Sequence, residues 1–317
     1  MNFLLVSLLV CAGHAEDFHR SGRGTAAAGF LNLGVGGRAM GMGEAYTAVA
    51  DEAHALYWNP AGLALTPRQE LVFTHATYLG SGFYDYAASV YRVGRGGLAA
   101  GVQHMSYGTV EETDASGSVT GQVSPRELTA ALGMAYAISP VAFGVSAKYV
   151  RSRLVRKAET AAVDLGLMLR LHSRLRFGVA ARNIGGDLKY DEERFRLPLS
   201  VRAGLMAKLN PWWLVSAEGV VPRSNGPYGA FGTEVRLANQ PNLGFALRAG
   251  YNSRTLRGVD GAAGATGGFG VAFGGWAVDY AVVPFGSVGM SHVASVSVQF
   301  GSGVRKGVQA PRASFAK

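Results

Sequence analysis

The feature that most constrains this chain is a series of long segments in which apolar residues alternate with small or polar ones. In Thr160–Leu171 the odd-numbered positions from Val163 onward are Val or Leu, and Asp164, Gly166 and Arg170 lie between them. Alternation with period two predicts a strand with one apolar face. Strands of soluble sheets usually have about five or six residues, whereas a tilted strand needs about nine to eleven to cross a bilayer. The segment length therefore favours a membrane-spanning strand.

Similar segments continue from residue 70 to residue 300. Every second connection is a tight turn, as at Ser139-Pro140 and Asn210-Pro211, and the others are mostly longer and more polar, as in Gly108–Ser124 and Gly186–Arg196. Outer-membrane barrels typically have tight turns on the periplasmic rim and long loops on the other. We count fourteen segments, at residues 70–79, 83–93, 97–107, 125–138, 141–153, 160–171, 175–185, 197–209, 212–221, 228–238, 243–254, 267–274, 276–284 and 291–300.

These segments predict an all-β fold, an antiparallel transmembrane β-barrel of about fourteen strands over residues 66–301. In lipid an unpaired backbone group costs several kcal/mol, so the sheet must close on itself. A soluble sandwich, which also alternates, is the alternative. Aromatic residues near the segment ends suit the girdles at the two membrane interfaces, or the core of a soluble barrel; they are Tyr78, Tyr107, Tyr149, Trp212, Trp213, Trp276, Tyr280 and Phe300.

The face opposite the apolar one is rich in Gly, Ala and single charges, and alternation directs it into the lumen. Charges of both signs are mixed there, and small residues leave room for an inserted segment. Two interpretations stay open: the charges contact such a segment, or they only pair across the wall. The lumen charges that we single out are Lys148, Asp164, Arg170, Arg182, Arg202, Glu218, Glu234 and Arg248.

Residues 1–15 predict a secretory signal peptide. The apolar stretch Phe3–Ala12 is followed by Gly13 and Ala15 at the small-residue spacing of a cleavage site. A core strand or a membrane anchor is the alternative. Cys11 is the only cysteine and lies in this segment, so disulfides and cysteine-based metal or redox chemistry are not expected in the mature chain.

The net charge of +9 does not indicate a nucleic-acid partner, because Lys and Arg are scattered singly along the strand-like segments. Only Arg151–Lys157 and the tail at residues 302–317, which we expect to be periplasmic, form basic patches. Lipopolysaccharide or another anionic surface is the better partner for an exported protein.

Residues 16–65 precede the first expected strand, and their main part, Gly29–Leu65, does not alternate. Glu44–Ala50 and Glu52–Trp58 suit two short helices, and Asn59-Pro60 ends the second. The glycines from Gly34 to Gly37 do not form a nucleotide-binding loop, because no strand precedes them and no βαβ unit follows.

Three stretches of this segment carry a resemblance: GGRAMGMG at residues 36–43, AYTAVAD at 45–51 and ALYWNPAGL at 55–63. They resemble the N-terminal motif of the PorV/PorQ family, a shorter branch of the superfamily that includes the FadL-type fatty-acid transporters. The resemblance implies an outer-membrane barrel whose N-terminal hatch, or plug, occupies the lumen. Glu44 and the extension beyond Phe300 depart from the family pattern. The positions that the resemblance assigns to the plug or its gating are Gly36, Gly37, Arg38, Gly41, Gly43, Asp51, Asn59, Pro60 and Ala61.

The same resemblance implies two functions. PorV-like proteins hold or shuttle secreted proteins at the outer membrane with a type IX secretion system, and FadL-like proteins pass hydrophobic small molecules through the hatch. The longest loop, Gly108–Ser124, is polar and lacks an apolar groove, which favours the secretion role over hydrophobic uptake. The expected partners are outer-membrane lipids, together with secretion components and cargo or a hydrophobic ligand. A porin-like structural protein is a third possibility.

Catalysis is not expected. The histidines do not have metal-ligand spacing, no Gly-x-Ser-x-Gly elbow is present, and the pairs Glu111-Glu112 and Glu192-Glu193 lie in polar loops. We therefore expect no catalytic residue, metal or cofactor.

Overall fold

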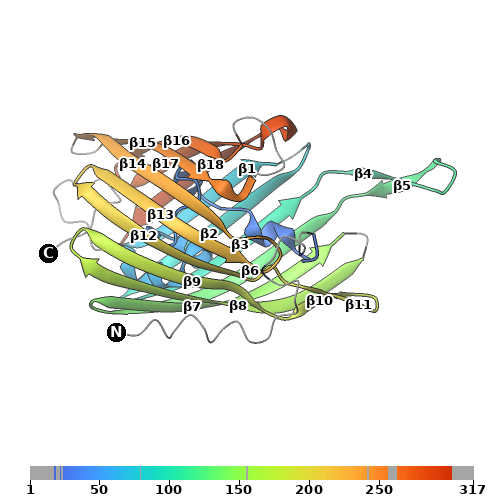
Figure 1. Cartoon of the computed structure of the whole chain (residues 1–317), viewed down its shortest axis with the longest axis horizontal. Coiled ribbons are helices and arrows are strands. Elements are labelled where there is room, and N and C mark those ends of the chain that lie inside the picture. Colours follow the sequence, from blue (N-terminus) through green and yellow to red (C-terminus); the bar gives the residue numbers. More distant parts are fainter. Residues whose placement is uncertain are drawn as a thin grey trace.

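The computed structural model describes residues 18, 22, 24–78, 80–154, 156–240, 243–255 and 263–301. Within them the chain forms a closed antiparallel β-barrel of fourteen strands, which confirms the predicted fold class (Figure 1). Strands adjacent in the barrel follow one another along the chain, and β18 closes the ring against β1. The barrel strands are β1 (Gln69–Thr77), β2 (Phe83–Val93), β3 (Gly96–Ser106), β6 (Arg126–Ile138), β7 (Val141–Arg153), β8 (Lys157–His172), β9 (Leu175–Gly185), β12 (Ser200–Asn210), β13 (Trp213–Pro222), β14 (Tyr228–Gln240), β15 (Leu243–Asn252), β16 (Ala265–Phe273), β17 (Trp276–Pro284) and β18 (Met290–Phe300).

Each expected segment corresponds to one strand, with boundaries that agree to about three residues. Connections of two residues follow β2, β6, β8, β12, β14 and β16, so they all lie on one rim, which we call the turn rim. The opposite rim, the loop rim, carries the other connections. The expected signal peptide and basic tail lie outside the described residues.

Two of the longer connections contain hairpins that the sequence had indicated only as loops. β4 (Val110–Thr113) pairs with β5 (Val119–Val123), and β10 (Asp187–Tyr190) pairs with β11 (Glu193–Arg196). The β4–β5 hairpin projects beyond the barrel at the loop rim (Figure 1). Its side chains are mostly exposed.

The outer face of the barrel is apolar. Exposed large side chains such as Leu132, Leu165 and Phe245 alternate with buried or lumenal ones along each strand. Trp212, Trp213, Trp276 and Phe300 are exposed near the turn rim, as expected for an interfacial girdle. Tyr78 and Tyr107 do not belong to such a girdle, because both are partly buried and pack against the interior cluster.

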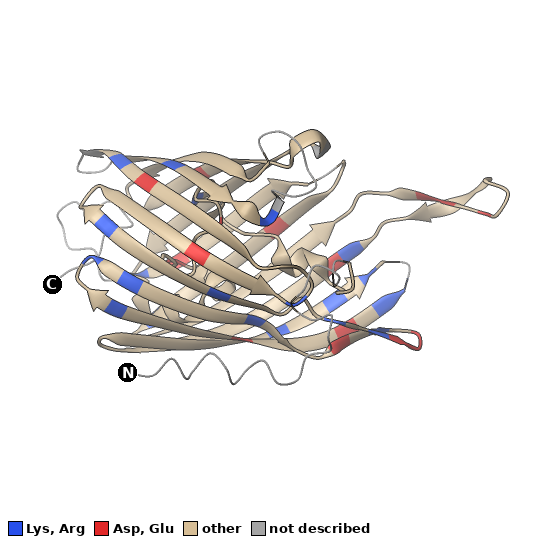
Figure 2. Cartoon of the chain, viewed as in Figure 1, with Lys and Arg blue, Asp and Glu red and all other residues tan. Residues whose placement is uncertain are grey.

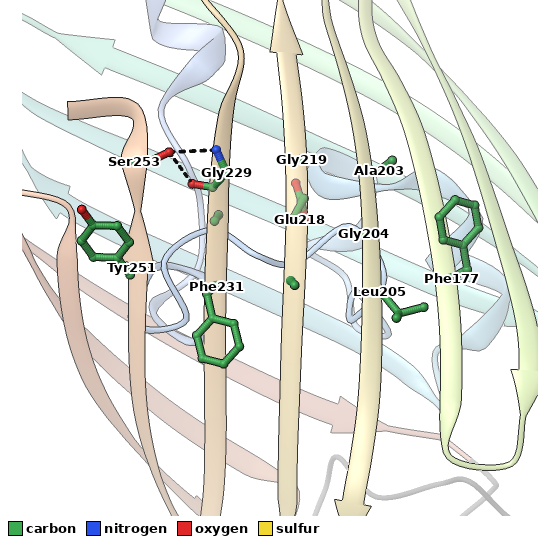
Figure 3. Close-up of a pocket in the computed structure, with 12 residues that line it drawn as sticks. Phe177, Ala203, Gly204, Leu205, Glu218, Gly219, Gly229, Phe231, Tyr251 and Ser253 are labelled. Carbon is green, nitrogen blue, oxygen red and sulfur yellow. Dashed lines mark hydrogen bonds between the residues drawn. The ribbon is translucent and has the colours of Figure 1, made fainter. Parts of the chain in front are cut away.

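Small residues leave a shallow groove in this outer wall over β12, β13 and β14 (Figure 3). Its floor includes Ala217 and Gly219, and the large side chains of Leu205, Phe231 and Tyr251 border it. None of the residues that line this groove is basic.

The N-terminal segment fills the barrel interior, where nearly every residue from Phe30 to Ala64 is buried. The blue chain in Figure 1 lies within the ring of strands. We call residues 24–65 the plug. It contains η3 (Gly29–Asn32), α1 (Gly37–Gly41), α2 (Ala55–Trp58) and η4 (Pro60–Leu65). None of the described helices is long and apolar enough to cross a membrane.

The plug contains short helices, as expected, but not where the sequence indicated them. The helix expected at Glu44–Ala50 is absent; the chain there forms turns, and Glu44 has a φ of 67°. A left-handed residue cannot continue a right-handed helix. The helix expected at Glu52–Trp58 is limited to Ala55–Trp58, and α1 lies instead in the glycine-rich stretch.

Candidate functional site: the plugged lumen

Asn59 fixes the junction between the plug and the barrel. Its side-chain amide donates to Thr47 O at 2.9 Å within the plug and to Leu167 O at 3.2 Å on β8. Its side-chain oxygen accepts from the backbone N–H of Ala61 at 3.1 Å, where it caps η4, and Pro60 occupies the first turn of that helix. One side chain thus holds two plug segments against the wall.

Arg38 is the centre of an ion-pair network that joins the plug to the wall, and it is almost completely buried. Its Nε and Nη2 donate to the two carboxylate oxygens of Glu234 on β14, at 2.7 and 3.1 Å. Its Nη1 donates to Asp51 Oδ1 at 3.1 Å and to the hydroxyl of Tyr46 at 3.0 Å. Bidentate arginine–carboxylate pairs have defined geometry, so this contact fixes the orientation of α1 in the lumen.

Glu234 also binds wall arginines. Arg248 Nε lies 2.7 Å and Arg236 Nη2 lies 3.1 Å from its carboxylate oxygens. Arg248 in turn contacts Asp279 Oδ1 on β17 at 2.9 Å. The plug residue Asp51 approaches Arg176 Nη2 on β9 at 3.4 Å. Three guanidinium groups compensate the negative charge of the buried Glu234 carboxylate. Removal of that carboxylate would leave these positive charges to repel one another in the protein interior.

A second contact joins the middle of the plug to β12 and β13. Both carboxylate oxygens of Glu218 accept from Thr47, one from its backbone N–H at 2.8 Å and one from its hydroxyl at 2.9 Å. Arg202 Nε donates to the same carboxylate at 2.5 Å, and its Nη2 donates to Glu44 O at 3.0 Å. This pair therefore supports the plug backbone directly.

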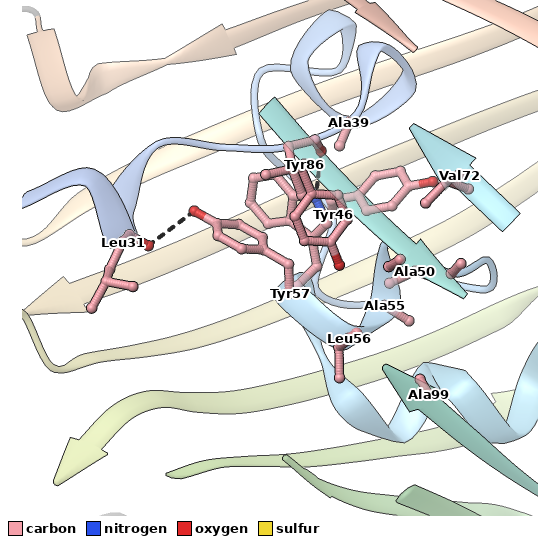
Figure 4. Packing of buried hydrophobic residues seen from close by; sticks show 14 of the residues in the cluster. Leu31, Ala39, Tyr46, Ala50, Ala55, Leu56, Tyr57, Val72, Tyr86 and Ala99 are labelled. Carbon is pink, nitrogen blue, oxygen red and sulfur yellow. Dashed lines mark hydrogen bonds between the residues drawn. The ribbon is translucent and has the colours of Figure 1, made fainter. Parts of the chain in front are cut away.

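Two further arginines hold the loop-rim side of the plug. Arg254 Nη2 lies 2.8 Å from Glu44 Oε1. The Arg182 guanidinium donates to Leu31 O at 3.0 Å and lies 3.8 Å above the ring of Tyr57, a cation–π geometry. Tyr57 itself donates to Leu31 O, as Figure 4 shows within the aromatic cluster around Tyr46 and Tyr86.

The remaining lumen charges differ in their surroundings. Lys148 Nζ lies 2.6 Å from Asp164 on the neighbouring strand and donates to Asn183 at 2.9 Å. This pair joins neighbouring strands of the wall, and its hydrogen-bond partners among the described residues also belong to the wall. Arg170 is exposed and forms no ion pair with a described residue. Both interpretations of the lumen charges therefore apply, each to different residues.

The glycines of the plug motif permit close approach to the wall. A Cβ on Gly37 would lie 2.6 Å from Asp279 O, and one on Gly43 would lie 2.6 Å from Tyr251 N. The wall supplies matching glycines: a Cβ on Gly166 would meet the Asn59 side chain, and one on Gly232 would meet Met42 O. Plug and wall backbones therefore touch at several points.

Tyr46, Glu52, His54 and Thr74 also belong to this site, although sequence analysis did not select them. His54 lies 3.1 Å from Glu52 Oε1 and 3.0 Å from Thr74 Oγ1, with its ring stacked on that of Tyr86. The alternation along β1 could have predicted that Thr74 faces the lumen. No sequence pattern indicated that His54 and Glu52 would face it.

Among the described residues, no cluster of three or more His, Cys, Asp or Glu side chains could hold a metal ion. A cavity between the plug at Met40–Glu44 and the wall at Asn252, Thr266 and Phe285 has a volume of about 20 Å³. That is room for about one water molecule.

A fourteen-stranded barrel with its lumen filled by its own N-terminal segment defines a class of plugged β-barrel proteins. Residues 10–162 match the model of an uncharacterised protein family, UPF0164. No curated protein matches the chain.

Several solved structures share the fold. The toluene transporter TbuX of Ralstonia pickettii is 16% identical with a TM-score of 0.61, over 86% of this chain and 100% of that one. The P. putida toluene transporter TodX is 16% identical with a TM-score of 0.60, over 84% and 99%. A Pseudomonas aeruginosa FadL homologue is 9% identical with a TM-score of 0.53, over 84% and 98%. At these identities the likeness concerns the fold, and neither these structures nor the family match carries the name PorV or PorQ.

Proposed function

We propose that this protein is an outer-membrane channel for hydrophobic small molecules, with the plug as its gate. The observation that carries the proposal is a lumen filled by a plug that buried ion pairs tie to the wall, within the fold shared by the toluene transporters. The apolar outer face suits a lipid environment, and the loop rim is then extracellular. This choice reverses the order suggested by the sequence, which favoured the secretion role, because the solved structures that share the fold include toluene transporters.

The gate can be tested with a crosslink between the plug and the wall. A Cβ placed on Gly204 of β12 would lie 3.6 Å from Ala48 N in the plug. Because each of these two atoms is about 1.5 Å from its own Cα, the two Cα atoms are at most about 6.6 Å apart, within the upper limit of about 6.8 Å for a disulfide. Because Cys11 is the only native cysteine, Ala48→Cys with Gly204→Cys gives a single defined pair in the mature chain.

The measurement is uptake of radiolabelled toluene by bacteria that express the chain. Uptake should exceed that of cells with an empty vector, fall to the vector level when the pair is oxidised, and recover on reduction. The single variant Gly204→Cys is the control and should not respond to redox state. Equal uptake by the oxidised and reduced pair would contradict gating by the plug, and uptake at the vector level for the wild type would contradict the function itself.

A further inference from the structure

A row of basic side chains lies on the outer face at the loop rim. Arg126 begins β6, Arg153 ends β7 and Lys157 begins β8; Arg126 is paired directly with Arg153, and Arg153 with Lys157. All three side chains are exposed. Since neighbouring strands are about 4.8 Å apart, the Cα atoms of the three residues lie within about 10 Å. Like charges placed directly opposite on adjacent strands destabilise a sheet.

The counter-ions near this row do not neutralise it. Glu159 lies 2.9 Å from Lys157 and 3.6 Å from Arg151, and Asp191 lies 2.7 Å from Arg156. Arg126 and Arg153 form no ion pair with a residue that the structure describes. We call Arg126, Arg151, Arg153, Arg156 and Lys157 the rim cluster. In Figure 2 basic segments lie at this end of the barrel with acidic segments beside them, and basic segments also lie at the opposite rim. The rim cluster keeps an excess of positive charge at the edge of the apolar outer face.

Directly below this cluster the outer wall is hollowed. From the rim toward the middle of the barrel, the cross-strand pair Leu128–Arg151 comes first. The next two outward-facing pairs, Ala130–Tyr149 and Leu132–Ala147, line a groove of about 770 Å³ across β2, β3, β6 and β7. Small outward-facing residues, among them Ala87, Ser89, Ala100, Ala130 and Ala147, form its floor, and Leu71, Leu132 and Tyr149 border it. At about 3.3 Å per residue, Ala130 lies about 13 Å from Arg126 along β6.

We propose that the rim cluster and this groove together bind one lipid with a phosphate-bearing, anionic headgroup. Arg126, Arg153 and Lys157 hold the phosphate, and an acyl chain fills the groove. Arginine pairs bind phosphate oxygens in a defined geometry, and the bound anion relieves the repulsion within the row. A lipid matches both features because its phosphate lies at the membrane boundary and its hydrocarbon lies below. The inference rests on the outer-membrane placement proposed above, but not on the transported molecule.

The test uses the folded protein in a neutral detergent and measures its melting temperature and the mass of its lipid adducts. The probes are phosphatidylglycerol, phosphatidylcholine with the same acyl chains, and inorganic phosphate. Phosphatidylglycerol should bind at least tenfold more tightly than phosphatidylcholine. Equal binding of the two lipids would overturn the inference, and so would stabilisation by inorganic phosphate that equals that by phosphatidylglycerol.

Variants separate the two halves of the site. Arg126→Gln with Arg153→Gln should weaken phosphatidylglycerol binding by about fivefold for each arginine removed, whereas Arg194→Gln on the β10–β11 hairpin should have no effect. Ala130→Trp should fill the groove and weaken binding, whereas Ala217→Trp fills the groove of Figure 3 and should not. Unchanged binding by either test variant would contradict the site. A protein that stays folded without detergent would instead contradict the membrane placement, so the two failures are distinguishable.

Discussion

Glu234 shows how single residues hold the plug. One carboxylate, buried in the lumen, contacts Arg38 of the plug and both Arg248 and Arg236 of the wall. In a low-dielectric interior these charges attract strongly, but Glu234, Arg38 and Arg248 have lost their hydration, whereas Arg236 is partly exposed. The group contributes to stability only while all partners are present.

We predict that Glu234→Gln destabilises the protein by about 3–5 kcal/mol, because it leaves buried guanidinium groups without their shared anion. The thermal midpoint in detergent should fall, and the plug should become more sensitive to protease. Glu111→Gln on the exposed β4 strand is the matched control and should change stability by less than about 0.5 kcal/mol. Equal midpoints for the two variants would contradict the role assigned to Glu234.

Asn59→Ala should loosen the plug junction. The change removes two donated bonds and one accepted bond, and leaves Thr47 O, Leu167 O and the Ala61 N–H without this partner. An unsatisfied buried group costs about 1–3 kcal/mol. The measurement is the rate of proteolysis of the N-terminal segment in outer-membrane vesicles, compared with Gln122→Ala on the exposed β5 strand. Identical rates would show that Asn59 does not fix the junction.

At the scale of elements, the plug differs from the barrel in what stabilises it. Its helices have only four to six residues, and helices shorter than about 12 residues are marginal in isolation. Wall side chains bond to the backbone of these helices: Ser295 Oγ accepts from the Gly37 N–H of α1, and Arg182 donates to Leu31 O of η3. The backbone hydrogen bonds of the barrel, by contrast, form between its own neighbouring strands, which close into a ring.

Deletion of residues 24–62 should therefore leave a folded barrel with an open lumen. We expect a clearly higher single-channel conductance in planar bilayers than for the full chain, because the plug occupies the cross-section that ions would use. Deletion of residues 110–123, which removes only the projecting β4–β5 hairpin, is the control and should leave the conductance low. If the plug deletion also conducts poorly, the plug is not what closes the barrel.

At the scale of the whole molecule, the outer face determines the solvent in which the protein is stable. Large apolar residues such as Leu132 and Phe273 are more than half exposed, and soluble monomers rarely expose large contiguous apolar patches. We predict that the protein needs detergent or lipid to remain folded and monomeric. Size-exclusion chromatography after detergent removal should show aggregation; a folded monomer in plain buffer would contradict the membrane assignment.

The sequence alone determined the barrel. Alternation along Thr160–Leu171 and similar segments predicted every barrel strand. Tight turns such as Ser139-Pro140 distinguished the turn rim from the loop rim. These features could be read locally because a side-chain period of two and the length needed to cross a bilayer are properties of each strand by itself. The inward direction of Arg202 and Glu234 followed from the same period.

Only the tertiary structure decided which charges meet. The plug and the wall are far apart in sequence, so Arg38 and Glu234 or Thr47 and Glu218 share no local pattern. The same is true of the plug helices: the propensity of Glu44–Ala50 favoured a helix, but contacts of Glu44 with Arg254 and Arg202 hold the chain in another conformation. Long-range electrostatic and packing contacts outweigh the weak local preferences of a short segment, and they exist only once the barrel has closed around it.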